Sequence, residues 1–341
     1  MSEIKPPSFI HNPYVSMAKS PILIMSIDQD PNTTEVMRWL LNYNEEPIRI
    51  NEAEQAVSLS HVEDGEVFLQ MDGRQLPLKS IKSYWYRRGN WQIDKPALSA
   101  EDKALEEESA KFLKRENDAV IEYLHHKLKA VPWLSDHASA TGINKDIVLD
   151  TAREHGLSVP PSLITGSRQV LLEFLDKHKE IVTKAIRTAI RYYTPTHWLP
   201  MYTEELTEEM AQSLPETFGL SLFQKKIPKR YEIRSFFLEN EYYSMAIFSQ
   251  KDAQTATDFR RYKHEKPNRT VPFTLPERIR SKLQKVMKSL GLKTGSIDLM
   301  VTPAGEYFFL EVNPIGQFGM TSYPCNYFLE RRIAQYLKDG K

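Results

Sequence analysis

Two apolar runs near the end of the sequence constrain the fold more than any other segment. They are GSIDLMVT at 295–302 and EYFFLEVN at 306–313. Between them lie Pro303, Ala304 and Gly305, a composition that favours a tight turn. Two strand-like runs joined by such a turn predict an antiparallel hairpin.

Three oxygen donors of this hairpin could converge, Asp298 on the first arm and Glu311 and Asn313 on the second. Because side chains alternate along a strand, Glu311 and Asn313 should share a face. Mg²⁺ prefers oxygen ligands and leaves coordination positions for phosphates, so the three residues predict a magnesium site. An ordinary half-exposed hairpin is the alternative. Carboxylates on an apolar strand are costly without a partner or a metal, which favours the magnesium site.

Length and composition exclude several classes of protein. A chain of 341 residues with 41% hydrophobic residues can form two or three packed subdomains. Its 45 basic residues balance 45 acidic ones, so no global field attracts nucleic acid or an anionic membrane. The single cysteine, Cys325, excludes an internal disulfide framework and suits a reducing compartment. We therefore expect a cytoplasmic protein that binds neither nucleic acid nor membrane.

The first part of the sequence alternates between strand and helix patterns. Apolar runs predict strands within 21–30, 46–50 and 80–88, and helical spacing predicts a helix over 33–43. A long charged helix is expected from about 99 to 129. This order predicts a small α/β domain that the long helix closes.

The rest of the sequence is richer in strands. Strand-like runs occupy 179–186 and 219–227, and the segment 231–249 has two apolar arms around Glu239-Asn240-Glu241, which predicts a hairpin. A helix is expected over 275–292, before the terminal strand pair. The order is that of an α+β fold rather than of a regular parallel sheet.

The terminal hairpin with its Asp…Glu-x-Asn pattern resembles the ATP-grasp superfamily, whose carboxylate-activating ligases end in a similar strand pair with magnesium ligands. The resemblance implies a combined α/β and α+β fold in three parts. These are an N-terminal α/β domain over 1–125, a central domain over 126–215 and a C-terminal antiparallel-sheet domain over 216–341. ATP would then lie between the last two domains.

The resemblance continues upstream of the hairpin, in the order that the superfamily shows. It implies that Lys145 and Lys184 are directed at the ATP phosphates. It also implies that LFQKKI at 222–227 is the adenine-binding hinge and that YEIRSFF at 231–237 supplies an acidic-x-Arg element near the nucleotide. The residues so assigned are Gln224, Lys225, Lys226, Ile227, Glu232 and Arg234. Taken singly, each could be a surface lysine, a strand end or a surface ion pair, and their order favours the nucleotide site.

Other segments resemble a narrower group, the graspetide or microviridin-like peptide maturases. These segments are SYWYRRGN at 83–90, TDFRRY at 257–262 and EVNPIGQFG at 311–319, with PCNY at 324–327. The ending is most similar to the maturase of the grasp-with-spasm system. Microviridin-type maturases usually have a tryptophan-rich ending there, so the core peptide and the ring pattern stay open.

This resemblance implies an ATP-dependent ligase. It would phosphorylate Asp or Glu side chains of a ribosomally made precursor peptide and join them to Ser or Thr as esters, or to Lys as amides. ATP and Mg²⁺, as two ions, are the expected cofactors. The expected partners are a precursor peptide with a leader and an acidic core, and a second copy of the chain in a homodimer. An amino-acid ligase of the same superfamily and a non-catalytic binding module are the alternatives.

Several arginines are expected to contact the acyl phosphate or the peptide. Arg234 and Arg260, with Asp258, are assigned catalytic roles, and Arg261, Arg87 and Arg88 are assigned to substrate binding. Arg87 and Arg88 end a strand of the first domain, where open α/β sheets place ligands. Solvated surface charge is the alternative for the arginine pair at 260–261. The aromatic stretch 188–206 could dock the leader or simply cover the core.

Overall fold

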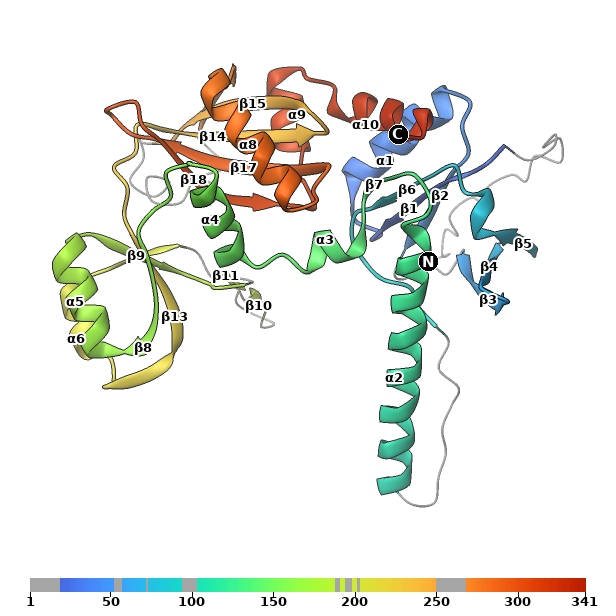
Figure 1. The fold of residues 1–341 in the computed structure, drawn as a ribbon, viewed down its shortest axis with the longest axis horizontal. Helices are drawn as coiled ribbons and strands as arrows, with labels where there is room; N and C mark the ends of the chain where they lie inside the picture. Colours follow the sequence, from blue (N-terminus) through green and yellow to red (C-terminus); the bar gives the residue numbers. More distant parts are fainter. Residues whose placement is uncertain are drawn as a thin grey trace, which may run out of the picture.

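The structure is a computed structural model that describes residues 19–51, 57–71, 73–93, 103–187, 191–193, 198–200, 203–249 and 268–341. Three main sheets, each with helices packed on it, follow one another along the chain (Figure 1). The expected mixture of α/β and α+β architecture is confirmed. In the described part of the chain, no helix combines the length and apolar character needed to cross a membrane.

The first sheet is parallel, with the strand order β2-β1-β6-β7. Its strands are β1 (Ile22–Ser26), β2 (Pro47–Asn51), β6 (Ser83–Tyr86) and β7 (Trp133–Ser135). Strand β1 is buried throughout, because Leu23 and Met25 join one apolar cluster and Ile22 and Ile24 join another. Helix α1 (Pro31–Asn42) begins with proline directly after its cap, Asp30.

A small antiparallel sheet and a long helix complete this N-terminal part. The sheet contains β3 (Val57–Glu63), β4 (Glu66–Met71) and β5 (Arg74–Pro77), and a short 3₁₀ turn, Leu78–Ser80, follows. Helix α2 (Lys103–Leu128) extends away from the body of the molecule (Figure 1). The expected boundary at 125 falls inside α2. Since β7 pairs with β6, the first sheet takes in residues up to 135.

The central sheet is antiparallel, with the strand order β12-β9-β13-β8. Its strands are β8 (Ser162–Ser167), β9 (Ile181–Lys184), β12 (Glu204–Leu206) and β13 (Thr217–Lys225). Helices α5 (Arg168–His178) and α6 (Glu208–Ser213) share an apolar cluster with this sheet, and β10 (Arg191–Tyr193) pairs separately with β11 (Trp198–Pro200). Strand β13 lies after the expected boundary at 215, so this sheet continues to residue 225.

The third sheet is antiparallel, with the order β16-β15-β14-β17-β18. Its strands are β14 (Tyr231–Leu238), β15 (Glu241–Phe248), β16 (Arg269–Phe273), β17 (Thr294–Val301) and β18 (Tyr307–Asn313). Both hairpins expected here, β14–β15 and β17–β18, are confirmed. One face carries the apolar cluster shared with α8 (Glu277–Ser289) and α4 (Lys145–Glu154). The other face carries the charged side chains of Arg234, Asp298 and Glu311 beside apolar side chains such as Phe236 and Met245, which join two further apolar clusters.

The C-terminal helices lead the chain back to the first sheet. Helix α9 (Gly319–Cys325) follows the loop after β18, and α10 (Leu329–Asp339) lies beside α1 (Figure 1). Ile333 and Leu337 of α10 share an apolar cluster with Ile24 and Val36 of the N-terminal part. A short helix, α3 (His137–Thr141), connects β7 toward α4. The first and third parts of the molecule are therefore packed together through α10.

Candidate active site

A row of charged side chains crosses three neighbouring strands of the third sheet. Arg234 on β14 lies opposite Asp298 on β17, and Asp298 lies opposite Glu311 on β18. The Nη1 atom of Arg234 is 3.2 Å from each carboxylate oxygen of Asp298. At the other end, Nζ of Lys145 is 3.6 Å from Oε2 of Glu311. Two adjacent carboxylates thus have a cation at each end of the row.

A β-bulge sets the orientation of β18. The register shifts between the Asp298–Glu311 pair and the Leu299–Phe309 pair, which leaves Leu310 as the extra residue. Without the bulge, Phe309 would share a face with Glu311. With it, Phe309 is buried in the apolar cluster under α8, whereas Glu311 is partly exposed on the opposite face. The bulge lets the strand contribute both to the core and to the polar row.

Asn313 ends β18 and shapes the loop that follows. It pairs with Ser296 of β17, and its Oδ1 accepts a hydrogen bond from the N–H of Ile315 at 3.1 Å. Ser296 Oγ donates to the carbonyl of Gln317 at 3.1 Å. Gly316 has a φ of +63°, and a Cβ there would lie 3.0 Å from the ring of Phe236. Only glycine fits this turn without strain.

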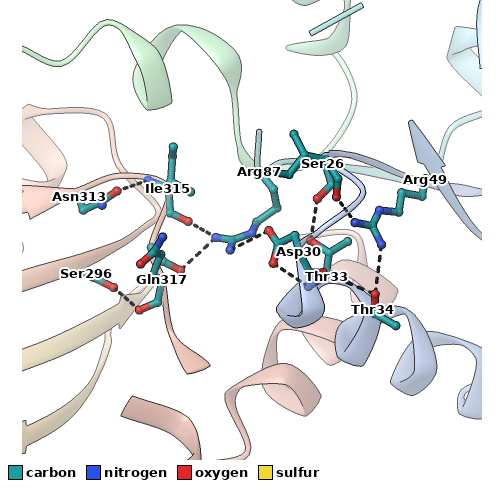
Figure 2. Close-up of polar contacts among 12 residues, drawn as sticks. Ser26, Asp30, Thr33, Thr34, Arg49, Arg87, Ser296, Asn313, Ile315 and Gln317 are labelled. Atoms are coloured by element: carbon teal, nitrogen blue, oxygen red, sulfur yellow. Dashed lines mark hydrogen bonds and ion pairs between the residues drawn. The ribbon is translucent and has the colours of Figure 1, made fainter. Parts of the chain in front are cut away.

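Arg87 holds the same loop from the N-terminal sheet. Its Nη1 donates to the carbonyls of Ile315 and Gly316, and its Nη2 lies 3.2 Å from Oδ2 of Asp30, as Figure 2 shows. The residue is 1% exposed, and burial lowers its pKa to about 10 although Asp30 opposes that shift. The guanidinium stays charged at neutral pH. Arg87 is thus already engaged by the protein itself, and its expected role in substrate binding stays a prediction.

The polar row has the donor chemistry of a magnesium site. Asp298 and Glu311 supply two carboxylates and Asn313 an amide oxygen at the end of the same face. Carboxylates directly opposite each other in a sheet repel, and a bound cation relieves that repulsion. Among the described residues there is no cluster of three or more His, Cys, Asp and Glu, so the site would depend on this mixed set. These residues fit Mg²⁺.

The residues expected to bind the nucleotide lie mainly on the central sheet. Lys184 pairs with Leu222, and the two-residue period of β13 puts Gln224 on the same face. Phe223, between them, packs into the cluster with α5 and α6 on the other face. Gln224 Nε2 donates to Ser162 Oγ at 2.8 Å. Lys184 therefore projects from the face of this sheet that the two helices leave uncovered.

Two backbone N–H groups of the expected hinge are already hydrogen-bonded within the protein. The N–H groups of Lys225 and Lys226 donate to the carbonyls of Pro161 and Glu180, both at 2.9 Å. The Lys226 side chain pairs with Glu205 at 2.8 Å, and hydrogen bonds to Glu205 and Glu180 raise its pKa against the opposing effect of burial. Among the described residues, the N–H of Ile227 has no backbone acceptor. The expected role of Ile227 in reading an adenine edge stays a prediction.

Glu232 has a partner that the sequence analysis missed. Its carboxylate pairs with Lys229, and the two side chains are only 8% and 4% exposed. The spacing of three residues, KRYE at 229–232, is the only sequence signal of this pair. Asp30, which holds Arg87, was also missed, although its position before Asn32 and Thr33 marks a helix cap.

Comparisons with known proteins assign the overall fold. No protein-family model matches the chain, and no curated protein does. The macrocyclase MdnC of Microcystis aeruginosa MRC, solved with its precursor peptide MdnA, matches with a TM-score of 0.76 and 26% identity over 94% of this chain and 100% of its own. A RiPP-associated ATP-grasp ligase of Chryseobacterium gregarium, solved with ADP and a leader and core peptide, matches with a TM-score of 0.75 and 25% identity over 94% and 95%. This chain has the ATP-grasp fold.

The ATP-grasp fold is also shared with a more distant ligase. The D-alanyl-alanine synthetase A of Vibrio cholerae matches with a TM-score of 0.59 and 15% identity over 95% of this chain and 99% of its own. The sequence resemblance to ATP-grasp peptide maturases is thus supported by the neighbours of higher identity.

Some expected ATP-grasp site residues cannot be placed. Asp258, Arg260 and Arg261 lie outside the described residues, as do 188–190, 194–197 and 201–202 of the aromatic stretch 188–206. Two of the expected arginines that the structure does describe differ in their surroundings. Arg234 is paired with Asp298, whereas Arg88 lines a cavity beside the loop after β18.

Proposed function

We propose that this chain is an ATP-dependent ligase that forms side-chain macrocycles in a ribosomally made precursor peptide. The observation that carries the proposal is the row Arg234–Asp298–Glu311–Lys145 in an ATP-grasp fold. The two neighbours at 26% and 25% identity support the peptide substrate, since both were solved with a precursor or a leader and core peptide.

The proposed reaction has two steps. A carboxylate oxygen of a substrate Asp or Glu attacks the γ-phosphorus of ATP, the bond from that phosphorus to the bridging oxygen breaks, and ADP leaves. A hydroxyl of Ser or Thr, or an amine of Lys, then attacks the acyl carbonyl and loses its proton to solvent, and inorganic phosphate leaves. Such phosphoryl transfer needs positioning and charge neutralisation more than a protein nucleophile.

The chain's own residues would bind and orient the reactants. Lys145 and Lys184 would hold ATP phosphates as point charges, and the Ile227 N–H would read the adenine. Arg234, held by Asp298, would stabilise negative charge beside the transferred group. Mg²⁺, which Asp298, Glu311 and Asn313 would hold, neutralises phosphate charge when bound.

Three further roles rest on the sequence and belong to the same proposal. Asp258, Arg260 and Arg261 would contact the acyl phosphate or the acidic core, and 188–206 would dock the leader. The chain would act as a cytoplasmic homodimer. Light scattering after size exclusion tests the dimer, and fractionation of the native host cells tests the location.

Mass spectrometry tests the proposed function directly. A precursor peptide encoded beside this chain, incubated with the protein, ATP and Mg²⁺, should lose the mass of one water for each bond formed and should release ADP. A gain of an amino-acid residue mass would instead support the alternative of an amino-acid ligase. ATP that stays intact with every acidic peptide tried would support a non-catalytic binding module.

A further inference from the structure

A cavity lies where the N-terminal sheet meets the loop after β18. It has a volume of about 230 Å³. Gln29, Asn32 and Arg88 line it from the N-terminal side, and Gln317 lines it from the other. The N-terminal residues follow β1 and β6, so the cavity lies at the carboxyl ends of parallel strands, where open α/β sheets bind ligands.

The charges around this cavity do not cancel. Arg87, Arg88 and Asp30 line it, so two guanidinium groups face one carboxylate. Arg87 already holds Asp30 and the carbonyls of the 315–316 turn. Arg88 makes no side-chain hydrogen bond or ion pair with any described residue, and its Nε atom is buried without a partner. A buried donor left unpaired is costly, so Arg88 is suited to an acceptor that the described residues do not supply.

Neutral groups around Arg88 also suit an anion. The amide side chains of Gln29, Asn32 and Gln317 can each donate hydrogen bonds. The first turn of α1, beginning at Pro31, lines the same cavity with the positive end of its helix dipole. Since a water occupies about 30 Å³ in the liquid, the cavity has room for a carboxyl group with its methylenes.

The cavity is connected to the proposed magnesium site. Gln317 follows Asn313 by four residues, and Ser296, the partner of Asn313 across the strands, holds the Gln317 carbonyl. Figure 2 shows the continuous chain of contacts from Asn313 through Ile315 to Arg87 and Asp30. A group bound in the cavity would therefore lie next to the loop that ends the metal-binding strand.

We propose that this cavity binds a side-chain carboxylate of the substrate peptide and that Arg88 is its main donor. The proposal rests on the function proposed above and adds a subsite for the acidic part of the substrate. Arg88 would contact the substrate, whereas Arg87 is a positioning residue that holds the cavity wall. A charge-assisted hydrogen bond in a partly buried site supplies the affinity.

Peptide binding tests this subsite without turnover. The full chain with ADP and Mg²⁺ is titrated calorimetrically with a blocked peptide of alternating Glu and Gly, and with its Gln counterpart. Wild type should bind the Glu peptide at millimolar concentration and the Gln peptide at least about tenfold more weakly. Arg88→Ala should remove that preference, and Arg88→Lys should restore part of it.

The matched control is Arg38→Ala, because Arg38 lies on α1 with a 66% exposed side chain and pairs with Glu35. It should keep the preference for the Glu peptide. ADP affinity and the melting temperature, measured for each variant, separate loss of the subsite from loss of fold. Inorganic phosphate in a further titration identifies the anion: competition weaker than by glutarate supports a carboxylate site, and stronger competition contradicts it.

Two results would overturn the subsite. One is equal binding of the Glu peptide to wild type and Arg88→Ala, and the other is no binding of that peptide to wild type. Neither outcome depends on ATP consumption. A chain that binds the Glu peptide through Arg88 and yet never releases ADP would refute the proposed function alone, and turnover that Arg88→Ala leaves unchanged would refute the subsite alone.

Discussion

Opposed carboxylates are the unusual feature of this site at the scale of single residues. Asp298 and Glu311 lie directly opposite each other on paired strands, an arrangement that costs free energy unless positive charge is nearby. Arg234 and Lys145 supply that charge at the two ends of the row. Because Arg234 has a side chain only 7% exposed, its charge is screened little by solvent. The arrangement suits a cation and phosphates that complete it.

Asp298→Asn tests the row. The change keeps the shape of the side chain but removes the charge that would hold Mg²⁺ and that pairs with Arg234. We expect ADP release to fall by at least about a hundredfold, since positioning and charge neutralisation carry phosphoryl transfer. An assay of ADP produced with the substrate peptide measures it.

The control for Asp298→Asn is Glu306→Gln, an exposed carboxylate in the turn of the same hairpin. It should leave ADP release unchanged. If Asp298→Asn kept wild-type turnover while folded, the assignment of the metal site to this row would be wrong.

At the scale of elements, local patterns predicted most strands, and contacts between distant segments decided the rest. The β14–β15 and β17–β18 hairpins have their partners next to them in sequence, so apolar runs and turn residues were enough. Strand β7 has only three residues and pairs with β6, which lies far upstream, so no local signal marks it. The bulge at Leu310 breaks the two-residue period, and only packing of Phe309 into the core reveals it.

The candidate site also contains residues that local patterns predicted and residues that only distant contacts reveal. Asp298, Glu311 and Asn313 were predictable because strand alternation brings them together. The burial of Arg87 was not, since Asp30 and the 315–316 turn reach it only in the folded chain. Its sequence neighbours are the aromatic residues of β6, which gave no sign of which arginine would stay available.

Gly316→Ala tests the turn after β18. The residue has a φ of +63°, and a Cβ would lie 3.0 Å from the Phe236 ring and 3.4 Å from Gly295 Cα. Backbone strain and the close contact together should lower the free energy of unfolding by about 2–4 kcal/mol. Urea denaturation measures it.

Gly305→Ala is the matched control, because Gly305 also has a positive φ, of +82°, but its Cβ would meet nothing within 4 Å. It should cost only the strain, about 1 kcal/mol. Equal losses in the two variants would show that the crowding at Gly316 has no energetic effect.

A histidine pair joins three elements of the N-terminal part. His125 of α2 stacks on His137 of α3, with ring centroids 4.1 Å apart, and both rings contact Tyr86 of β6 edge-on. Burial, with a smaller contribution from the neighbouring His137, lowers the pKa of His125 to about 4, and Asp136 opposes the shift. The folded chain therefore holds His125 neutral at a pH where the unfolded chain protonates it.

The stability of the protein should fall as the pH decreases from about 6.5 toward 4. In that window the unfolded state binds more protons at His125 than the folded state, so unfolding becomes easier. After allowance for solvent screening, the loss from this residue is about 1–2 kcal/mol. Urea denaturation at several pH values measures it in wild type and in His125→Gln, which should flatten the dependence.

His126→Gln is the control, because His126 is the exposed neighbour on the same helix. It should retain the wild-type pH dependence. If His125→Gln retained that dependence as well, acid destabilisation would have another source in the chain.

At the scale of the whole molecule, the proposed site draws on residues from all three parts of the chain. The third sheet carries the carboxylates, and the N-terminal sheet supplies the Arg87 contact that holds the loop after β18. In the proposed function, the central sheet would add Lys184 and the hinge. Helix α10 packs beside α1 and fixes the first part against the third (Figure 1). The geometry near Asn313 therefore depends on a residue more than two hundred positions away in sequence.

Arg87→Met tests this long-range support. The change leaves the buried Asp30 carboxylate and the two turn carbonyls without their donor, and breaking a buried ion pair by removing one partner costs about 3–5 kcal/mol of unfolding free energy. The double change Arg87→Met with Asp30→Leu should recover part of that loss, because it removes the unpaired charge as well. Urea denaturation of both variants measures these effects.

A catalytic measurement distinguishes a positioning role of Arg87 from a role in stability alone. If Arg87 orients the loop that ends the metal-binding strand, the double variant should remain folded yet require more Mg²⁺ for half-maximal ADP release. The reason is that Asp30→Leu removes the unpaired charge but does not restore the hydrogen bonds to the 315–316 turn. Titration of Mg²⁺ at saturating ATP reads this out, with Arg38→Ala as the unchanged control. A double variant with the wild-type Mg²⁺ requirement would restrict Arg87 to joining the first and third parts of the fold.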